Sequence, residues 1–336
     1  NLKKTPLKLL AMSTLKDSLT QYLMKLITIR LISLKVIMSS SIAISFGQQD
    51  AMFTHYLFNM LNSNPAYAGS RDVLSVVALS RSQWGGVEGA PRTQTISLHS
   101  PMFSKSLSAG LTMCLDKIGP TQLTSSNFDI SYRTKISSKG TLAFGIKAGA
   151  NFYNIDLNSL DLTTQADPSF SNNFTSNLAL NLGAGTFLQF PKFYVGFSVP
   201  RINQNNLNQS SIASRSLPSL QRHYYLISGG ILKISNRLAF RPSSHLKITL
   251  GAPVQFDFTS LLILDDFVWA GAMIRSGDAL GLLIGLNISK QLQFGYSYDW
   301  SFGLGLDKLS KSNSHEFMLR YELFSKKKRI RSPRYF

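Results

Sequence analysis

Residues 107–116 read LSAGLTMCLD, and this stretch decides the fold. Its apolar positions alternate with small or polar ones and are Leu107, Ala109, Leu111, Met113 and Leu115. A period of two places successive side chains on opposite faces of a β-strand, whereas a helix repeats its apolar positions every three or four residues. About ten residues is also the length that a tilted strand needs to cross a bilayer. The stretch therefore indicates a membrane-spanning strand.

The same alternation recurs along most of the chain. It predicts strands at 73–84, 92–100, 107–116, 122–134, 141–153, 175–189, 192–200, 222–234, 237–250, 252–264, 266–275, 279–288, 291–300 and 314–324. These are fourteen strands, an even number, as a single-chain bacterial barrel requires. The sequence therefore predicts an all-β fold, a single antiparallel transmembrane β-barrel of about 14 strands.

The connections between the strands sort by length. Short links such as Pro191, 235–236 and 289–290 follow even strands, whereas the longest gaps, 154–174 and 201–221, follow odd strands. Outer-membrane barrels have short periplasmic turns and longer outer loops. A soluble β-sandwich or propeller is the alternative, but its loops need not sort in this way. Aromatic residues near strand ends are compatible with interfacial girdles: Trp84, Tyr132, Tyr153, Tyr194, Tyr224, Trp269, Tyr298 and Trp300.

Composition agrees with a barrel. Hydrophobic residues are 44% of the chain and charged residues only 15%, against about 25% charged in soluble domains. The mean hydropathy is nevertheless only +0.02. No stretch approaches the roughly 20 consecutive apolar residues of a spanning helix. Alternation explains both facts, because every lipid-facing residue is followed by a lumen-facing one.

The net charge of +18 is concentrated at the two ends. Residues 1–47 and residues 325–336 each carry a net +6, which leaves +6 for the residues between them. A nucleic-acid-binding protein would spread its charge over one folded face with interleaved aromatics. The distribution therefore argues against nucleic acid as a partner.

The N-terminal charge belongs to a pattern typical of a secretory signal. Positive residues up to Lys35 give way to an apolar run that ends in small residues at Ser45 and Gly47. We expect translation to start at Met24, cleavage to fall before Gln48, and residues 1–23 to be an upstream extension. The expected divisions are then 1–47 extension and signal peptide, 48–72 N-terminal extended segment, 73–324 barrel, and 325–336 basic periplasmic tail.

The sequence gives little sign of catalysis. It contains no Gly-x-Ser-x-Gly elbow, His-Glu-x-x-His helix, P-loop or Cys-x-x-Cys pair. The single cysteine, Cys114, is interpreted as a small wall residue. The histidines and the acids Asp116, Asp129, Asp299 and Glu316 have no spacing that demands a dyad, and are interpreted as lumen residues. We therefore predict no enzyme activity, no cofactor and no metal site; an outer-membrane hydrolase is the weakest alternative.

Several phrases resemble the PorP/SprF family of Bacteroidetes outer-membrane proteins. They appear in the family's order over most of the mature chain: 48–50, 53–56, 64–70, 83–84, 89–95, 99–101, 116–121, 296–299, 314–316 and 332–336. The most specific are Asn-Pro-Ala-Tyr-Ala-Gly at 64–69 and the hairpin from Trp84 to Thr95. Ala51 departs from the proline that family members often carry there.

The resemblance implies an outer-membrane component of the type IX secretion and gliding machinery. Its implied role is to dock or retain a secreted, adhesin-like protein through that protein's C-terminal domain, with periplasmic secretion or motor components and outer-membrane lipid as further partners. Both termini are expected in the periplasm. The candidate partner-binding residues are Trp84, Arg92, Asp116, Lys117, Lys326, Lys327, Lys328 and Arg329. A passive porin remains the alternative.

Overall fold

The computed structural model describes residues 51–102, 106–157, 174–175, 178–203, 221–302 and 313–324. Within these ranges no helix has the length and apolar character needed to cross a membrane. The strands are β1 (Leu74–Ser82), β2 (Arg92–Pro101), β3 (Leu107–Ile118), β4 (Thr121–Lys135), β5 (Thr141–Ile155), β6 (Phe174–Thr175), β7 (Ala179–Gln189), β8 (Phe193–Val199), β9 (His223–Gly230), β10 (Leu232–Lys233), β11 (Leu238–Thr249), β12 (Gln255–Leu264), β13 (Val268–Arg275), β14 (Ala279–Asn287), β15 (Leu292–Ser301) and β16 (Asn313–Leu323).

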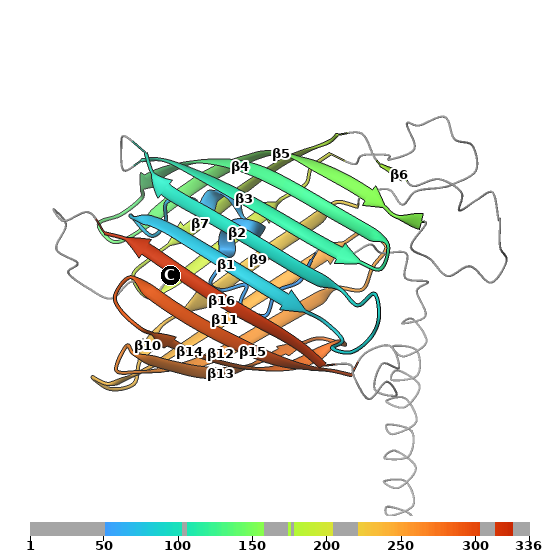
Figure 1. Ribbon diagram of the computed structural model, residues 1–336. Coiled ribbons are helices and arrows are strands. Elements are labelled where there is room, and N and C mark those ends of the chain that lie inside the picture. Colours follow the sequence, from blue (N-terminus) through green and yellow to red (C-terminus); the bar gives the residue numbers. More distant parts are fainter. Residues whose placement is uncertain are drawn as a thin grey trace, which may run out of the picture. The chain divides into compact units, whose positions relative to one another are not determined.

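Fourteen of these strands close into one antiparallel barrel (Figure 1). Sequence neighbours pair around the wall, and β6 and β10 are two-residue additions to β5 and β11. The barrel closes where β1 pairs with β16, from Leu74 opposite Leu323 to Ser82 opposite His315. The predicted barrel, its strand number and its strand positions are confirmed to within a few residues at the strand ends.

The alternation read from the sequence separates the two faces of the wall. Along β14 the outward side chains are leucine and isoleucine, with Leu282 51% and Ile284 53% exposed. The residues between them face the lumen and are buried. On other strands the lumen positions carry charged or polar groups such as Asp257, Arg275 and Asp299, all 0% exposed. Lipid accepts the apolar face, while the charged groups find partners inside the barrel.

The links also sort by length. One end of the barrel is called the long-link end here. It carries the links 83–91, 119–120, 156–178, 200–222, 250–254, 276–278 and 302–312. The opposite short-link end carries 102–106, 136–140, 190–192, 231–237, 265–267 and 288–291. The four longest links all lie at the first end.

The lumen is filled by the segment that precedes β1. This segment, residues 51–72, is called the plug here; it contains a short helix, α2 (Met60–Ser63), and a 3₁₀ turn, η1 (Pro65–Tyr67). In Figure 1 it is the blue coil between the walls. The prediction of an extended segment is therefore wrong for the described part of 48–72. Asn64 is extended as expected, but its side chain accepts a hydrogen bond from Ala66 N and starts a new turn at Pro65.

The plug and the wall share one hydrophobic core. Leu57, Met60 and Leu61 of the plug are at most 1% exposed, and Phe58 packs on Trp269 of β13 with ring centroids 4.8 Å apart. Trp269 is thus a core residue, and so are two further aromatics expected in the interfacial girdles, Tyr153 and Tyr194. Their strand-end position was recognised, but the face they occupy depends on a plug that provides apolar surface inside the lumen.

Candidate functional site

The plug is anchored near the long-link end by Glu316 of β16. Its carboxylate accepts the backbone N–H groups of Thr54 at 2.9 Å and His55 at 2.8 Å, and it also contacts His55 Nδ1 at 2.9 Å. Glu316 and His55 are both 0% exposed. A buried carboxylate needs several charge-assisted partners to offset the loss of hydration. The barrel wall therefore carries a charge placed to hold the backbone of the plug.

Arg81 of β1 completes this anchor. Its guanidinium donates to Thr54 Oγ1 at 2.9 Å, to Asp299 at 2.6 Å and to Glu316 at 3.1 Å. Thr54 Oγ1 in turn donates to Asp299 at 2.6 Å. The cluster thus joins two acids, one cation and the plug across three adjacent strands, β1, β16 and β15. Removing Arg81 would leave both acids without this cation in the lumen.

Other wall side chains hydrogen-bond to backbone carbonyls of the plug. The guanidiniums of Arg241 and Arg320 each lie over the ring of Phe58, 5.2 Å from its centroid. Arg320 also donates to the carbonyl of Phe58, and Lys147 of β5 donates to that of Asn62 at 3.0 Å. These bonds replace the backbone partners that an irregular segment lacks. The plug is therefore held by hydrogen bonds from the wall and forms part of the folded barrel.

The wall is also shaped to fit the plug. A Cβ at Gly145 of β5 would collide with the backbone of Pro65 and Ala66, and one at Gly185 of β7 would collide with the side-chain amide oxygen of Asn64. Glycine is needed at Gly145 because the two backbones approach closely, and at Gly185 because the Asn64 side chain occupies the space of a Cβ.

The plug runs the length of the lumen. Ala51 lies near Asp116 and Gln255 at the long-link end, whereas Arg71 pairs with Glu322 at 2.5 Å near the short-link end, where β16 finishes. The start of β1 and the end of β16 thus share the short-link end, as an even strand number requires. Gln48 and Phe336 lie outside the described ranges, so the expectation that both are in the periplasm stays a prediction. Ala51, the first described residue, lies at the long-link end, whereas β1 starts at the short-link end.

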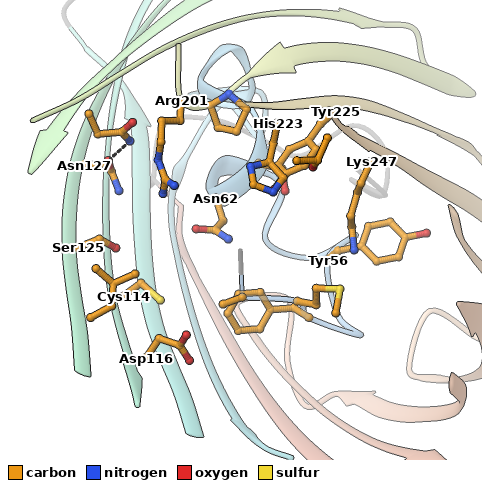
Figure 2. Close-up of a pocket in the computed structure, with 18 of the residues that line it drawn as sticks. Tyr56, Asn62, Cys114, Asp116, Ser125, Asn127, Arg201, His223, Tyr225 and Lys247 are labelled. Atoms are coloured by element: carbon orange, nitrogen blue, oxygen red, sulfur yellow. Dashed lines mark hydrogen bonds between the residues drawn. The ribbon is translucent and has the colours of Figure 1, made fainter. Parts of the chain in front are cut away.

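A polar chamber remains between the plug and the wall at the long-link end (Figure 2). Its volume is about 160 Å³. One side carries Cys114, Asp116, Ser125 and Asn127, and the other carries His223, Tyr225 and Lys247. Arg201 lies between these two groups, and the plug contributes Tyr56 and Asn62. Lys247 donates to Asp257 at 2.8 Å, so the side chain is fixed in place. Such a concave site with convergent polar groups can bind a small polar group.

The candidate residues of β2 and β3 gather at the long-link end. Arg92 and Lys117 are exposed neighbours across the β2–β3 pair, while Asp116 faces the chamber and accepts a hydrogen bond from Thr93 Oγ1 at 2.6 Å. Trp84, in the link 83–91, has a positive φ of 47°. Their role in partner binding stays a prediction. Lys326, Lys327, Lys328 and Arg329 lie outside the described residues.

Sequence reasoning missed the anchor of the plug. Asp299 and Glu316 were recognised as lumen residues, but their contacts with Thr54, His55 and Arg81 were not. The motif at 53–56 could have indicated it, because polar residues in a family motif before the first strand suggest a specific contact with the barrel. Within the described ranges, no group of three potential ligands among His, Cys, Asp and Glu gathers as a metal site would require.

These features define the class of the protein: a membrane β-barrel whose lumen is occupied by its own N-terminal segment. The chain belongs to the PorP/SprF family of type IX secretion system membrane proteins, whose model matches residues 45–321. No curated protein of related sequence matches it.

Solved structures of other barrels are similar in part. Omp33, an outer membrane protein of Acinetobacter baumannii, has a TM-score of 0.43 and 9% identity, and the match covers 75% of this chain and 98% of that one. The toluene transporter TbuX of Ralstonia pickettii has a TM-score of 0.44 and 9% identity, covering 79% and 93%. The monoaromatic hydrocarbon channel CymD has a TM-score of 0.46 and 11% identity, covering 83% and 95%.

Proposed function

We propose that this barrel sits in the outer membrane and docks or retains a secreted protein of the type IX pathway. The family match supports a part in that secretion system. Docking through the C-terminal domain of the secreted protein is the finer statement, and it rests on what the resemblance of the sequence implies. The chain acts in this account by binding and without catalysis.

The observation that carries the proposal is the plug. A porin needs a water-filled path from one end of the barrel to the other. Here the buried residues 53–71 occupy that path, held by Glu316, Arg81 and Arg320. A lumen filled in this way favours a rigid platform for a partner over the passage of solutes. The passive porin is therefore the less favoured function.

The long-link end is the proposed face for the secreted protein. Long links suit adaptable contacts with another protein surface, and the chamber opens among them. The short-link end and the basic tail 325–336 would then face the periplasm and its secretion or motor components. The proposal extends to a role in gliding only where the retained protein is an adhesin.

Co-purification from native membranes in mild detergent tests the proposal. We expect one secreted protein to dominate the material bound to the barrel. Replacing 201–221 by a minimal turn should release that protein while the barrel stays folded, because surface loops contribute little to strand pairing. Removing 326–336 should instead disturb secretion or coupling without releasing the bound protein.

The matched control is a similar change at the short-link end, in which residues 288–291 are replaced by another tight turn. That variant should keep the secreted protein. If none of these changes affects retention, secretion or gliding, and only the uptake of small solutes responds, the docking function is wrong and the porin function replaces it.

A further inference from the structure

The chamber at the long-link end contains buried polar atoms that have no hydrogen-bond partner within the described part of the chain. They are both ring nitrogens of His245, both amide atoms of Asn59, Asn151 Nδ2 and Asn181 Oδ1. The four side chains line the chamber and are at most 5% exposed. They come from the plug and from three strands, β5, β7 and β11, so they converge from different directions. Buried polar groups of this kind call for partners.

The charge of the lining favours an anion. Lys147, Arg201 and Lys247 line the chamber against a single acid, Asp116. Two of the cations are already held by acids outside the lining: Lys147 lies 3.7 Å from Asp129, and Lys247 lies 2.8 Å from Asp257. The Lys147 ammonium also donates to the carbonyls of Leu61 and Asn62, so its three N–H bonds are used. The Lys247 ammonium donates to Asp257 and Gln255 and keeps one further N–H for a bound group.

The unpartnered atoms include both donors and acceptors. Asn59 and Asn151 present N–H donors, while Asn59 and Asn181 present carbonyl acceptors. A simple inorganic anion would use only the donors. The last residue of a polypeptide chain uses both kinds, because its carboxylate accepts hydrogen bonds and its amide N–H donates one.

The size of the chamber fits the same group. A cavity of roughly 150 Å³ holds a molecule as large as benzene, and this chamber measures about 160 Å³. It therefore accepts about one residue. Its rim includes Pro200, Ala252 and Pro253, which belong to links at the long-link end, so the preceding residues of a bound chain would leave in that direction. Phe53 and Tyr56 offer apolar surface to the side chain of that residue.

We propose that the chamber binds the C-terminal residue of a polypeptide chain, with its free carboxylate facing Lys247 and His245. This inference rests on the proposed function, because it assigns the contact to the end of the secreted protein. It places the recognised group inside the barrel mouth rather than on the loops alone. The plug then has a second part, since Asn59 and Tyr56 form one wall of the site.

Cys114 provides a direct reporter, because it is the only cysteine of the chain and lines the chamber. The probes are N-acetyl-alanyl-alanine with a free carboxylate and the same compound as its primary amide. Purified full-length barrel in detergent is treated with N-ethylmaleimide at increasing probe concentration, and labelling of Cys114 is followed by mass spectrometry. The Cys114→Ser protein gives the background.

We expect the acid to slow labelling and the amide to do so at least about tenfold less effectively, because a charge-assisted hydrogen bond is lost. Asn151→Ala and His245→Ala should each weaken protection by the acid by about tenfold. Asn287→Ala removes the same amide at the short-link end, where its Nδ2 donates to Asp266 O at 2.6 Å, and should leave protection unchanged. Unchanged heat-modifiable migration in gels checks that each variant is folded.

Equal protection by acid and amide, or protection by neither, would overturn the proposal. Stronger protection by galacturonate than by the peptide acid would also overturn it and assign the chamber to acidic saccharides. The proposed function fails separately, by the absence of any secreted protein on the unmodified barrel. If the barrel retains that protein equally well after Cys114 is alkylated, the chamber is not the contact although docking stands.

Discussion

At the residue scale the account depends on wall side chains that hold the plug. Glu316→Gln keeps the size of the side chain but removes the charge that faces Arg81 and the plug backbone. Breaking a buried ion pair costs about 3–5 kcal/mol. We expect the variant to lose its folded gel mobility at a lower temperature or urea concentration than the unmodified protein.

The control for this change is the exposed pair Arg237 and Asp265 at the short-link end. Arg237 donates two hydrogen bonds, at 2.8 and 2.6 Å, and thereby lowers the pKa of Asp265. The contribution of this pair is present above the ordinary pKa of aspartate and is lost as pH falls through the lowered value. Since water screens the pair, Asp265→Asn should change the unfolding midpoint far less than Glu316→Gln. Equal effects of Glu316→Gln and Asp265→Asn would contradict the anchoring role.

A second prediction concerns the glycine that faces the plug. Gly145→Ala adds a methyl group that would collide with the backbone of Pro65 and Ala66. Overpacking of this kind costs about 1–3 kcal/mol, so the unfolding midpoint should fall. Gly85→Ala is the matched control, because its Cβ would meet only Asn313 O at 3.9 Å. If Gly145→Ala were as stable as Gly85→Ala, the plug would not lie against β5.

Single residues were the hardest level to predict. Asp299 and Glu316 could be placed in the lumen, because their position in alternating strands fixes the face. Their partner Arg81 could not be inferred, since the contact brings together segments far apart in the sequence. The expected place of Trp269 in an interfacial girdle was wrong for the same reason. Alternation separates the two faces of a strand, but it does not show that Phe58 of the plug offers apolar surface inside the lumen.

At the element scale the strands were predictable and the plug was not. A strand such as 279–287 repeats its pattern every two residues and needs no tertiary information to be recognised. Residues 51–72 have no period. Their α2 helix is only four residues long, and its stability comes from packing inside the barrel. The Asn64-Pro65 step lies in the segment that was expected to be extended, and its pattern does not indicate the turn that begins at Pro65.

The plug itself can be tested by replacing residues 53–62 with a Gly/Ser segment of equal length. The change removes the buried side chains of Leu57, Phe58 and Leu61, whose packing positions the backbone groups that Glu316 and Arg241 contact. We expect the barrel to form with a lower unfolding temperature, because lumen charges lose partners and apolar burial is lost. Circular dichroism checks that the barrel forms, and the temperature at which heat-modifiable migration is lost measures its unfolding. An unchanged unfolding temperature would contradict a plug integrated in the core.

At the scale of the whole molecule the sorting of links predicts the orientation in the membrane. An epitope inserted at Gly251, at the long-link end, should be labelled on intact cells. An epitope at Asp266, at the short-link end, should be reached only after permeabilisation. Both sites lie in exposed links of the described structure. The reverse labelling pattern would show that the long-link end faces the periplasm, and the secreted protein would then have to dock elsewhere.

The central claim is that the plug fills the lumen, so that the barrel binds a partner and does not conduct. The most direct measurement is the conductance of the purified full-length protein in planar bilayers, beside the variant with residues 53–62 replaced. The account predicts no steady conductance from the unmodified protein and a stable, salt-proportional conductance from the variant. A stable, salt-proportional conductance from the unmodified protein, without any secreted partner, would contradict it.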